Sequence, residues 1–121
     1  MATIFLIDDD SSIITLFDKF LTAIGHEIVA KAYNGEEAVK LFHEFRKAPD
    51  LILMDHRMPI KDGITAAKEI LKLNNTSKII FLSADYSIKD KALALGAKYF
   101  LEKPFKLDEL SKMIEKIISE N

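Results

Sequence analysis

The sequence predicts an α/β protein built on a five-stranded parallel sheet with helices on both faces. Apolar runs alternate five times with segments of helical periodicity, which is typical of such sheets. The runs are short and continuously apolar, as expected for strands buried on both faces. We place strands at residues 2–7, 27–32, 50–54, 78–83 and 98–101, and helices at residues 11–24, 35–46, 63–73, 86–95 and 107–119.

Each expected element has its own signal along the chain. The strand at 27–32 is the most polar of the five, which predicts an edge position. The first helix follows Asp10, which can cap it, as can Ser11 or Ser12, and Gly25 ends it. Gly96 closes the fourth helix in the same way. The apolar stripes of the five helices are Ile14, Phe17, Leu21 and Ile24; Ala38, Leu41, Phe42 and Phe45; Ile64, Ala67, Ile70 and Leu71; Ile88, Ala92 and Leu95; and Leu107, Leu110, Ile114, Ile117 and Ile118.

Length and composition limit the classes of function. The 121 residues fit one domain over residues 1–121, with no room for an output domain. With 17 basic and 19 acidic residues and no basic stripe, direct binding to nucleic acid is not expected. The chain has no cysteine, so disulfides and thiolate metal sites are excluded, and a cytoplasmic location fits. No apolar run approaches the roughly 20 residues that span a bilayer, so membrane insertion is not expected.

Four of the expected strands end in residues that can do chemistry. The first ends in Asp8-Asp9-Asp10, the third in Asp55, the fourth in Ser83 and the fifth in Glu102-Lys103-Pro104. The carboxyl ends of parallel strands share one edge, and ligands bind in the crevice there. Carboxylates, a hydroxyl and an ammonium group are therefore predicted to converge on one pocket.

The acids predict a divalent cation at this edge. Neighbouring carboxylates raise one another's pKa unless a positive charge lies among them, and Mg²⁺ prefers oxygen ligands, typically one or two carboxylates. Asp8, Asp9 and Asp55 are the candidate ligands. Asp10 is better explained as the cap of the following helix.

Three further interpretations concern single residues. A carboxylate beside Mg²⁺, such as Asp55, can attack a phosphoryl group and form an acyl phosphate. The alternative is that Asp55 caps the third helix, but Asp62 and Gly63 offer their own turn chemistry later in the chain.

Lys103 can pair with Asp55 and then with phosphoryl oxygens, and its bond to Pro104 allows a cis peptide. Ser83 can donate to a phosphoryl oxygen, although an isolated serine at a strand end is more often a helix cap.

Together the motifs resemble the response-regulator receiver domain of two-component signalling, in a stand-alone form like the chemotaxis regulators. The resemblance runs from Ile4 to the last helix and rests on Leu6-Ile7-Asp8-Asp9, Met54-Asp55, Met58-Pro59, Asp62-Gly63, Ser83-Ala84 and Lys103-Pro104-Phe105. It implies a flavodoxin-like three-layer αβα sandwich with strand order 2-1-3-4-5. It also implies Asp55 as phosphoacceptor with Lys103 and Ser83 beside it. Mg²⁺ (or Mn²⁺) would bind Asp9, Asp55 and the backbone carbonyl of Arg57, with Asp8 acting through water.

The resemblance further implies a switch, not an enzyme. A sensor histidine kinase or a phosphotransfer protein would donate the phosphoryl group, and the domain would support its own phosphotransfer and autodephosphorylation. Ser83 would move toward the phosphoryl group, and Phe100, at the aromatic switch position, would rotate inward. That rotation would reshape the surface of the fourth helix, fifth strand and fifth helix for an unknown downstream protein, in a chemotaxis complex, a phosphorelay or another effector.

Two features are particular to this sequence. Arg57 and Asp85 each lie two residues after a site residue, and we expect them to form an ion pair across the pocket mouth that hinders attacking water. The alternative is an exposed pair of little consequence.

Many transcription-factor receivers dimerise through acidic residues before the switch aromatic, but residues 97–99 hold no acid, so a monomer or weak dimer is expected. His26, His43 and His56 show no metal-ligand spacing.

Three rival functions are weighed against the receiver. A haloacid-dehalogenase-type phosphatase would place the phosphoryl group on Asp8, but no strand after Lys103 ends in the acidic pair it needs. A flavin-binding module needs a Ser/Thr/Gly-rich phosphate loop where this chain has three acids. A scaffold independent of phosphorylation would not need the complete pocket.

Overall fold

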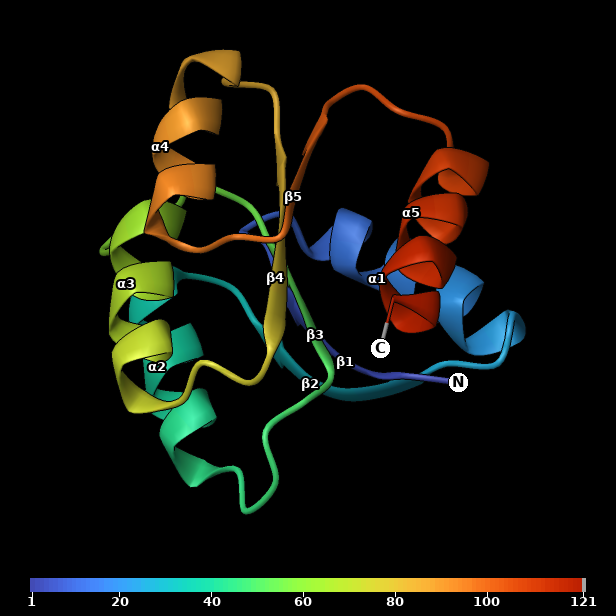
Figure 1. The fold of residues 1–121 in the computed structure, drawn as a ribbon, viewed down its shortest axis with the longest axis horizontal. Coiled ribbons are helices and arrows are strands. Elements are labelled where there is room, and N and C mark those ends of the chain that lie inside the picture. Colours follow the sequence, from blue (N-terminus) through green and yellow to red (C-terminus); the bar gives the residue numbers. More distant parts are fainter. Residues whose placement is uncertain (121) are drawn as a thin grey trace.

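The computed structural model describes residues 1–120 as a parallel sheet between two layers of helices (Figure 1). None of the helices in that range is long and apolar enough to cross a membrane. The strands are β1 Thr3–Ile7, β2 Glu27–Ala32, β3 Leu51–Met54, β4 Lys78–Ser83 and β5 Tyr99–Glu102; the helices are α1 Ser11–Ala23, α2 Gly35–Glu44, α3 Gly63–Leu73, α4 Lys89–Leu95 and α5 Leu107–Ser119.

The strand order is β2-β1-β3-β4-β5, so the expected 2-1-3-4-5 order is confirmed, as is the edge position of the polar strand β2. The register aligns the ends of the three central strands. Ile7 lies opposite Met54, and Met54 lies opposite Phe81. The residues that follow β1 and β3 therefore begin side by side, which brings Asp8 next to Asp55.

Helices α2, α3 and α4 cover one face of the sheet, and α1 and α5 cover the other (Figure 1). Because strand side chains alternate between faces, each face has its own apolar core. Phe5, Ile52 and Phe81 belong to the core under α2 to α4, whereas Leu6 and Leu53 belong to the core under α1 and α5. All five side chains are almost completely buried, so the strands that carry the site are held on both sides.

Short polar side chains cap the helices that begin beside the site. Asp10 accepts the backbone N–H of Ser12 at 2.9 Å and caps α1, which agrees with its expected role. Asn34 caps α2 and Asp62 caps α3 through the N–H groups of their own first turns. These caps satisfy helix N–H groups that have no partner within the helix.

Two expected helix boundaries were wrong. The segment 86–95 is not one helix: a 3₁₀ turn at Tyr86–Ile88 precedes α4, because the Asp85 carboxylate accepts the Ser87 N–H and tightens the chain there. Helix α2 ends at Glu44, two residues before the expected end at 46. Phe45 has an extended backbone, and its ring packs edge-on against Phe5 at 5.4 Å. Tertiary packing thus overrides local helix propensity.

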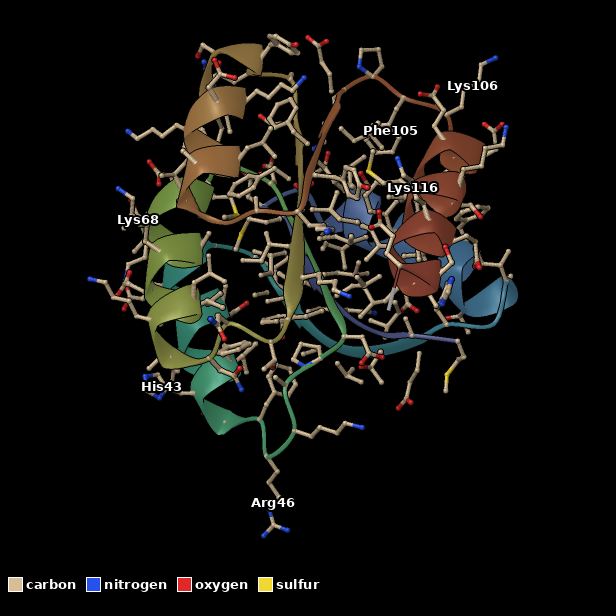
Figure 2. All side chains as sticks on the ribbon, in the orientation of Figure 1. His43, Arg46, Lys68, Phe105, Lys106 and Lys116 are labelled. Atoms are coloured by element: carbon tan, nitrogen blue, oxygen red, sulfur yellow. The ribbon has the colours of Figure 1, made fainter. Side chains whose placement is uncertain are left out.

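The histidines play packing or surface roles, as expected. His26 is buried, and its Nδ1 accepts the backbone N–H of Ala2 at 3.1 Å. His43 lies on the outer side of α2, away from the sheet (Figure 2). Neither belongs to the acidic edge of the sheet.

Candidate functional site

Backbone hydrogen bonds fix the position of three site residues that follow the strands. Asp8 donates its N–H to the end of β2 at 3.1 Å, Asp55 donates to the end of β1 at 3.0 Å, and Lys103 donates to Ser83 O at 2.9 Å. These bonds continue the hydrogen-bond ladders of the sheet by one residue. The side chains therefore project from a rigid edge instead of from mobile loops.

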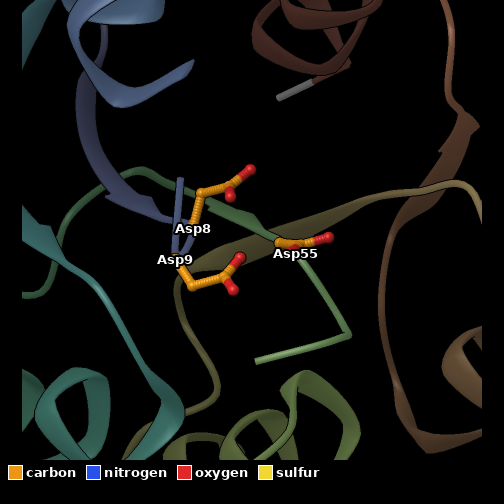
Figure 3. A group of neighbouring side chains, drawn as sticks. All are labelled: Asp8, Asp9 and Asp55. Atoms are coloured by element: carbon orange, nitrogen blue, oxygen red, sulfur yellow. The ribbon is translucent and has the colours of Figure 1, made fainter. Parts of the chain in front are cut away.

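The carboxylates of Asp8, Asp9 and Asp55 gather at this edge, with one oxygen of each within 4.8 Å of the others (Figure 3). Asp8 and Asp55 are buried, whereas Asp9 is exposed. Three oxygen donors at this spacing, open to solvent on one side, fit a hard divalent cation that keeps part of its water shell. The three acids named from the sequence are thus brought together as predicted.

The Lys103 ammonium enters the same cluster from β5. Its Nζ lies 3.0 Å from Asp8 Oδ2 and 3.6 Å from Asp55 Oδ1. The Lys103–Pro104 peptide bond is cis. Burial opposes the charged ammonium, but the carboxylates of Asp55 and Asp8 outweigh that effect and raise the pKa of Lys103 above its usual value. Lys103 therefore carries a fixed positive charge against two carboxylates.

Asp55 is held in an unfavourable electrostatic environment. Its pKa is raised to about 6, first because burial penalises the carboxylate and second because Asp8 is a nearby negative charge. Lys103 opposes the shift without cancelling it. The site therefore has a deficit of positive charge, which a divalent cation would remove.

His56 and Gly63 brace the backbone of Asp55, a role that sequence reasoning missed. The N–H of Gly63 donates to His56 O at 2.8 Å, and the N–H of Ile64 lies 3.3 Å from His56 Nδ1. The His56 ring thus faces the start of α3. A β-carbon on residue 63 would overlap the Asp55 carbonyl oxygen. The Asp62-Gly63 pair was the available signal, because glycine is the residue that permits such close approach.

Ser83 closes the site on the β4 side. Its side chain is 1% exposed, and its Oγ accepts the backbone N–H of Asp85 at 3.0 Å. Asp85 in turn accepts a hydrogen bond from Arg57 Nη2 at 3.2 Å, so the expected contact between these two residues is present. The Arg57 side chain is 79% exposed, and the pair bridges the loops that follow β3 and β4.

Phe100 stands apart from the acidic cluster. It is half-buried on β5, and its ring contacts the Tyr86 ring edge to face at 5.9 Å. No sequence signal singled out Tyr86, because an exposed tyrosine in a loop has no pattern of its own. Tyr86 begins the 3₁₀ turn that follows β4, and its ring connects that turn to the ring of Phe100.

Replacing Asp55 by Asn should stabilise the folded protein in buffer without divalent cations. The native pKa of about 6 lies above the unfolded value of 3.8, so ionisation of Asp55 costs folding free energy as pH rises through that window. We expect D55N to raise the free energy of unfolding by about 1–3 kcal/mol at pH 7.5, with the gain fading as pH falls from about 6 to about 4 and absent at lower pH. Urea denaturation across this pH range measures it.

The matched control for this substitution is Asp10→Asn. Asp10 is an exposed helix cap whose pKa is lowered by its hydrogen bonds with Ser12, and Asn caps helices as well as Asp does. D10N should therefore give no gain at pH 7.5. Equal stability of D55N and the wild-type protein at pH 7.5 would contradict the electrostatic account of Asp55.

Comparison with known proteins agrees with this geometry. A family model described as the response regulator receiver domain matches residues 4–115. The chemotaxis protein CheY of Bacillus subtilis is 40% identical over 98% of this chain and 100% of its own length. CheY of Thermotoga maritima is 34% identical over 94% of this chain and 95% of its own.

Solved structures show the same similarity. CheY in the CheX-CheY-BeF3-Mg complex of Borrelia burgdorferi superposes with a TM-score of 0.90 at 25% identity, covering 96% of this chain and 88% of that one. The response regulator TrrA of Thermotoga maritima, in complex with Mg²⁺ and BeF, superposes with a TM-score of 0.85 at 34% identity, covering 97% and 99%. The sheet order, the acidic edge and these matches lead to one conclusion: the chain belongs to the response regulator receiver domain family of two-component signalling.

Proposed function

We propose that this chain is a phosphorylation-activated switch that takes a phosphoryl group onto Asp55 from the phosphohistidine of a sensor kinase or phosphotransfer protein. The observation that carries the proposal is the buried Asp55 carboxylate, flanked by Asp8, Asp9 and the Lys103 ammonium. Its pKa of about 6 leaves it ionised, and so nucleophilic, at neutral pH. The chain would act as a phosphoacceptor that supports its own phosphotransfer and autodephosphorylation.

Mg²⁺, or Mn²⁺, fits the donor set of this site. Asp9, Asp55 and the backbone carbonyl of Arg57 would hold the ion directly, and Asp8 would hold it through water. When bound, the ion neutralises charge on the oxygens of the transferring phosphoryl group. The deficit of positive charge around Asp55 supports this assignment.

The residues of the chain perform the remaining steps. An Asp55 oxygen forms a bond to phosphorus while the bond from phosphorus to the donor imidazole nitrogen breaks, and the electron pair of that bond returns to the imidazole. Lys103 is placed to shift its ion pair from Asp55 to a phosphoryl oxygen. Ser83 is placed to donate its hydroxyl to a second oxygen once it releases the loop that it holds.

The proposal is tested by incubation with a small phosphodonor and Mg²⁺, followed by mass mapping of the acyl phosphate. We expect one phosphoryl group on Asp55, none on D55N, and none when Mg²⁺ is chelated. Replacing Asp8 by Asn should slow transfer yet leave Asp55 the labelled residue. A label on Asp8 would instead support a phosphatase of the haloacid-dehalogenase type, and no label at all would support a scaffold independent of phosphorylation.

The ion pair between Arg57 and Asp85 supports a second proposal, that these residues set the lifetime of the phosphorylated form. The pair spans the two loops that border Asp55. A guanidinium group held there would narrow the path of a water molecule to the acyl phosphate. Since Arg57 is largely exposed, its contribution is that of a surface pair, up to about 1 kcal/mol.

Arg57→Ala should shorten the half-life of the acyl phosphate by about twofold to fivefold, because water then reaches Asp55 more freely. Loss of label after removal of the donor measures the rate. Arg46→Ala is the control, since Arg46 lies in the loop after α2 and points away from the body of the protein (Figure 2). An unchanged half-life in R57A would mean that the ion pair is a surface contact with no effect on the lifetime of the acyl phosphate.

A pocket lined in part by Lys103 supports the choice of a protein as phosphodonor. It has a volume of about 460 Å³, and its lining is mainly apolar: Ile13, Leu16, Phe17, Ala84, Lys103, Pro104, Phe105 and Leu107. Two of the lining residues, Phe17 and Phe105, stack with ring centroids 6.1 Å apart. Leu16 is 46% exposed at the rim of the pocket. Lys103 belongs to both the pocket and the acidic cluster, so an apolar helix seated here would present its phosphohistidine to Asp55.

Replacing Leu16 by Ser should slow transfer from a phosphorylated histidine phosphotransfer domain by about tenfold, because a large apolar contact contributes 1–3 kcal/mol to binding. Transfer from a small phosphodonor should be unchanged. Thr15→Ser, one residue earlier on the exposed side of α1, is the control. Equal slowing with both donors would mean that Leu16 acts on the site itself and would contradict docking at this pocket.

The output surface completes the proposal. We infer that the chain works in the cytoplasm as a monomer or weak dimer. It would signal by protein contact through α4, β5 and α5, where Phe100 is half-buried. Rotation of that ring would change the surface presented to the downstream protein.

A further inference from the structure

The 3₁₀ turn between β4 and α4 contacts both residues of the proposed switch. Ser83 Oγ accepts the N–H of Asp85 at 3.0 Å at one end of the turn. The Asp85 carboxylate accepts both the N–H and the hydroxyl of Ser87, which locks the turn internally. Because Ser83 Oγ accepts this N–H, movement of the Oγ atom toward Asp55 either breaks its bond to the turn or moves the turn with it.

Tyr86 lies at the centre of this turn and contacts the second switch residue. Tyr86 is 53% exposed as a residue, and its ring meets the Phe100 ring edge to face, with centroids 5.9 Å apart and planes at 89°. Lys89 steadies the tyrosine from the other side: its Nζ lies 3.2 Å from the phenol oxygen and 5.2 Å from the ring centroid. The Tyr86 ring is therefore held in place over Phe100.

The sheet places Ser83 and Phe100 on the same face. In the β4–β5 register, Ser83 lies opposite Glu102 and Phe81 lies opposite Phe100. Side chains two residues apart on a strand share a face, so Phe100 lies one diagonal step from Ser83. The Tyr86 ring contacts the Phe100 ring beside this diagonal, so an inward rotation of the Phe100 ring would separate the two aromatic rings.

We propose that Tyr86 is the positioning residue that couples Ser83 to Phe100 and that it stabilises the arrangement preceding phosphorylation. This inference rests on the proposed function. In the present arrangement the hydroxyl of Ser83 holds the turn, and the turn holds Phe100 through Tyr86. An aromatic pair of this geometry corresponds to roughly a twofold to tenfold factor in an equilibrium constant. Loss of the Tyr86 ring should ease the switch by that factor.

The test is the affinity for beryllofluoride in the presence of Mg²⁺, measured by titration of backbone amide NMR signals. Because coupling between two sites is reciprocal, a variant that releases Phe100 binds the anion more tightly. We expect Tyr86→Ala to lower Kd about twofold to tenfold. Tyr86→Phe keeps the ring contact and loses only the bond to Lys89, so its Kd should stay near the wild-type value.

A double-mutant cycle separates coupling through Phe100 from a general loosening of the loop. If Tyr86 acts through the Phe100 ring, Tyr86→Ala should have no further effect on Kd in a Phe100→Leu background. A second measurement is made on the variant without Mg²⁺ or the anion: Tyr86→Ala should shift the Phe100 ring resonances of the free protein toward those of the wild type saturated with the anion.

The outcomes distinguish this inference from the proposed function. If the wild-type protein neither binds beryllofluoride nor accepts a phosphoryl group, the proposed function fails. If the wild type binds but Tyr86→Ala has an equal or weaker affinity, or has the same effect with and without the Phe100 ring, the coupling through Tyr86 is wrong and the proposed function stands.

Discussion

The balance of charge at the carboxyl ends of β1, β3 and β5 governs the rest of the structure. Three carboxylates face one ammonium group, and two of the acids, Asp8 and Asp55, are buried. Lys103 lies nearer to Asp8 than to Asp55, so Asp55 keeps the larger share of the unpaired charge. The fold tolerates this cost because two apolar cores hold the strands beneath. The site is stabilised by whatever brings positive charge to it, which is the physical basis of the reactivity proposed for Asp55.

Much of this arrangement follows from the residues alone. Asp8, Asp55 and Lys103 end apolar runs, and parallel strands bring such ends together whatever the details of packing. The order of the strands could not be predicted from the residues alone, because periodicity does not encode it. The resemblance to receiver domains implied that order. The Asp10 cap could be assigned because the side-chain chemistry of a helix N-terminus is local.

What the sequence could not predict depends on contacts between distant residues. Phe45 ends α2 early because its ring packs against Phe5, forty residues away along the chain. The break before α4 depends on how one carboxylate, Asp85, divides its hydrogen bonds between Ser87 and Arg57. Tyr86 acquires a role only once β5 places Phe100 beneath it. Each of these contacts joins a local preference to a tertiary partner that no window of sequence contains.

The contrast between backbone positions held by the sheet and a turn held by side chains explains how a change of charge at Asp55 can reach a surface on the far side of β4. The acidic cluster is rigid, since sheet hydrogen bonds hold three of its backbone positions. The turn after β4 is different, because it rests on side-chain hydrogen bonds and one aromatic contact, most of them exposed to solvent. Exposed contacts of this kind are each worth little, so a rearrangement of the turn costs less free energy than a rearrangement of the sheet edge. A rigid site beside a weakly held turn is therefore suited to convert one covalent event into a change of shape.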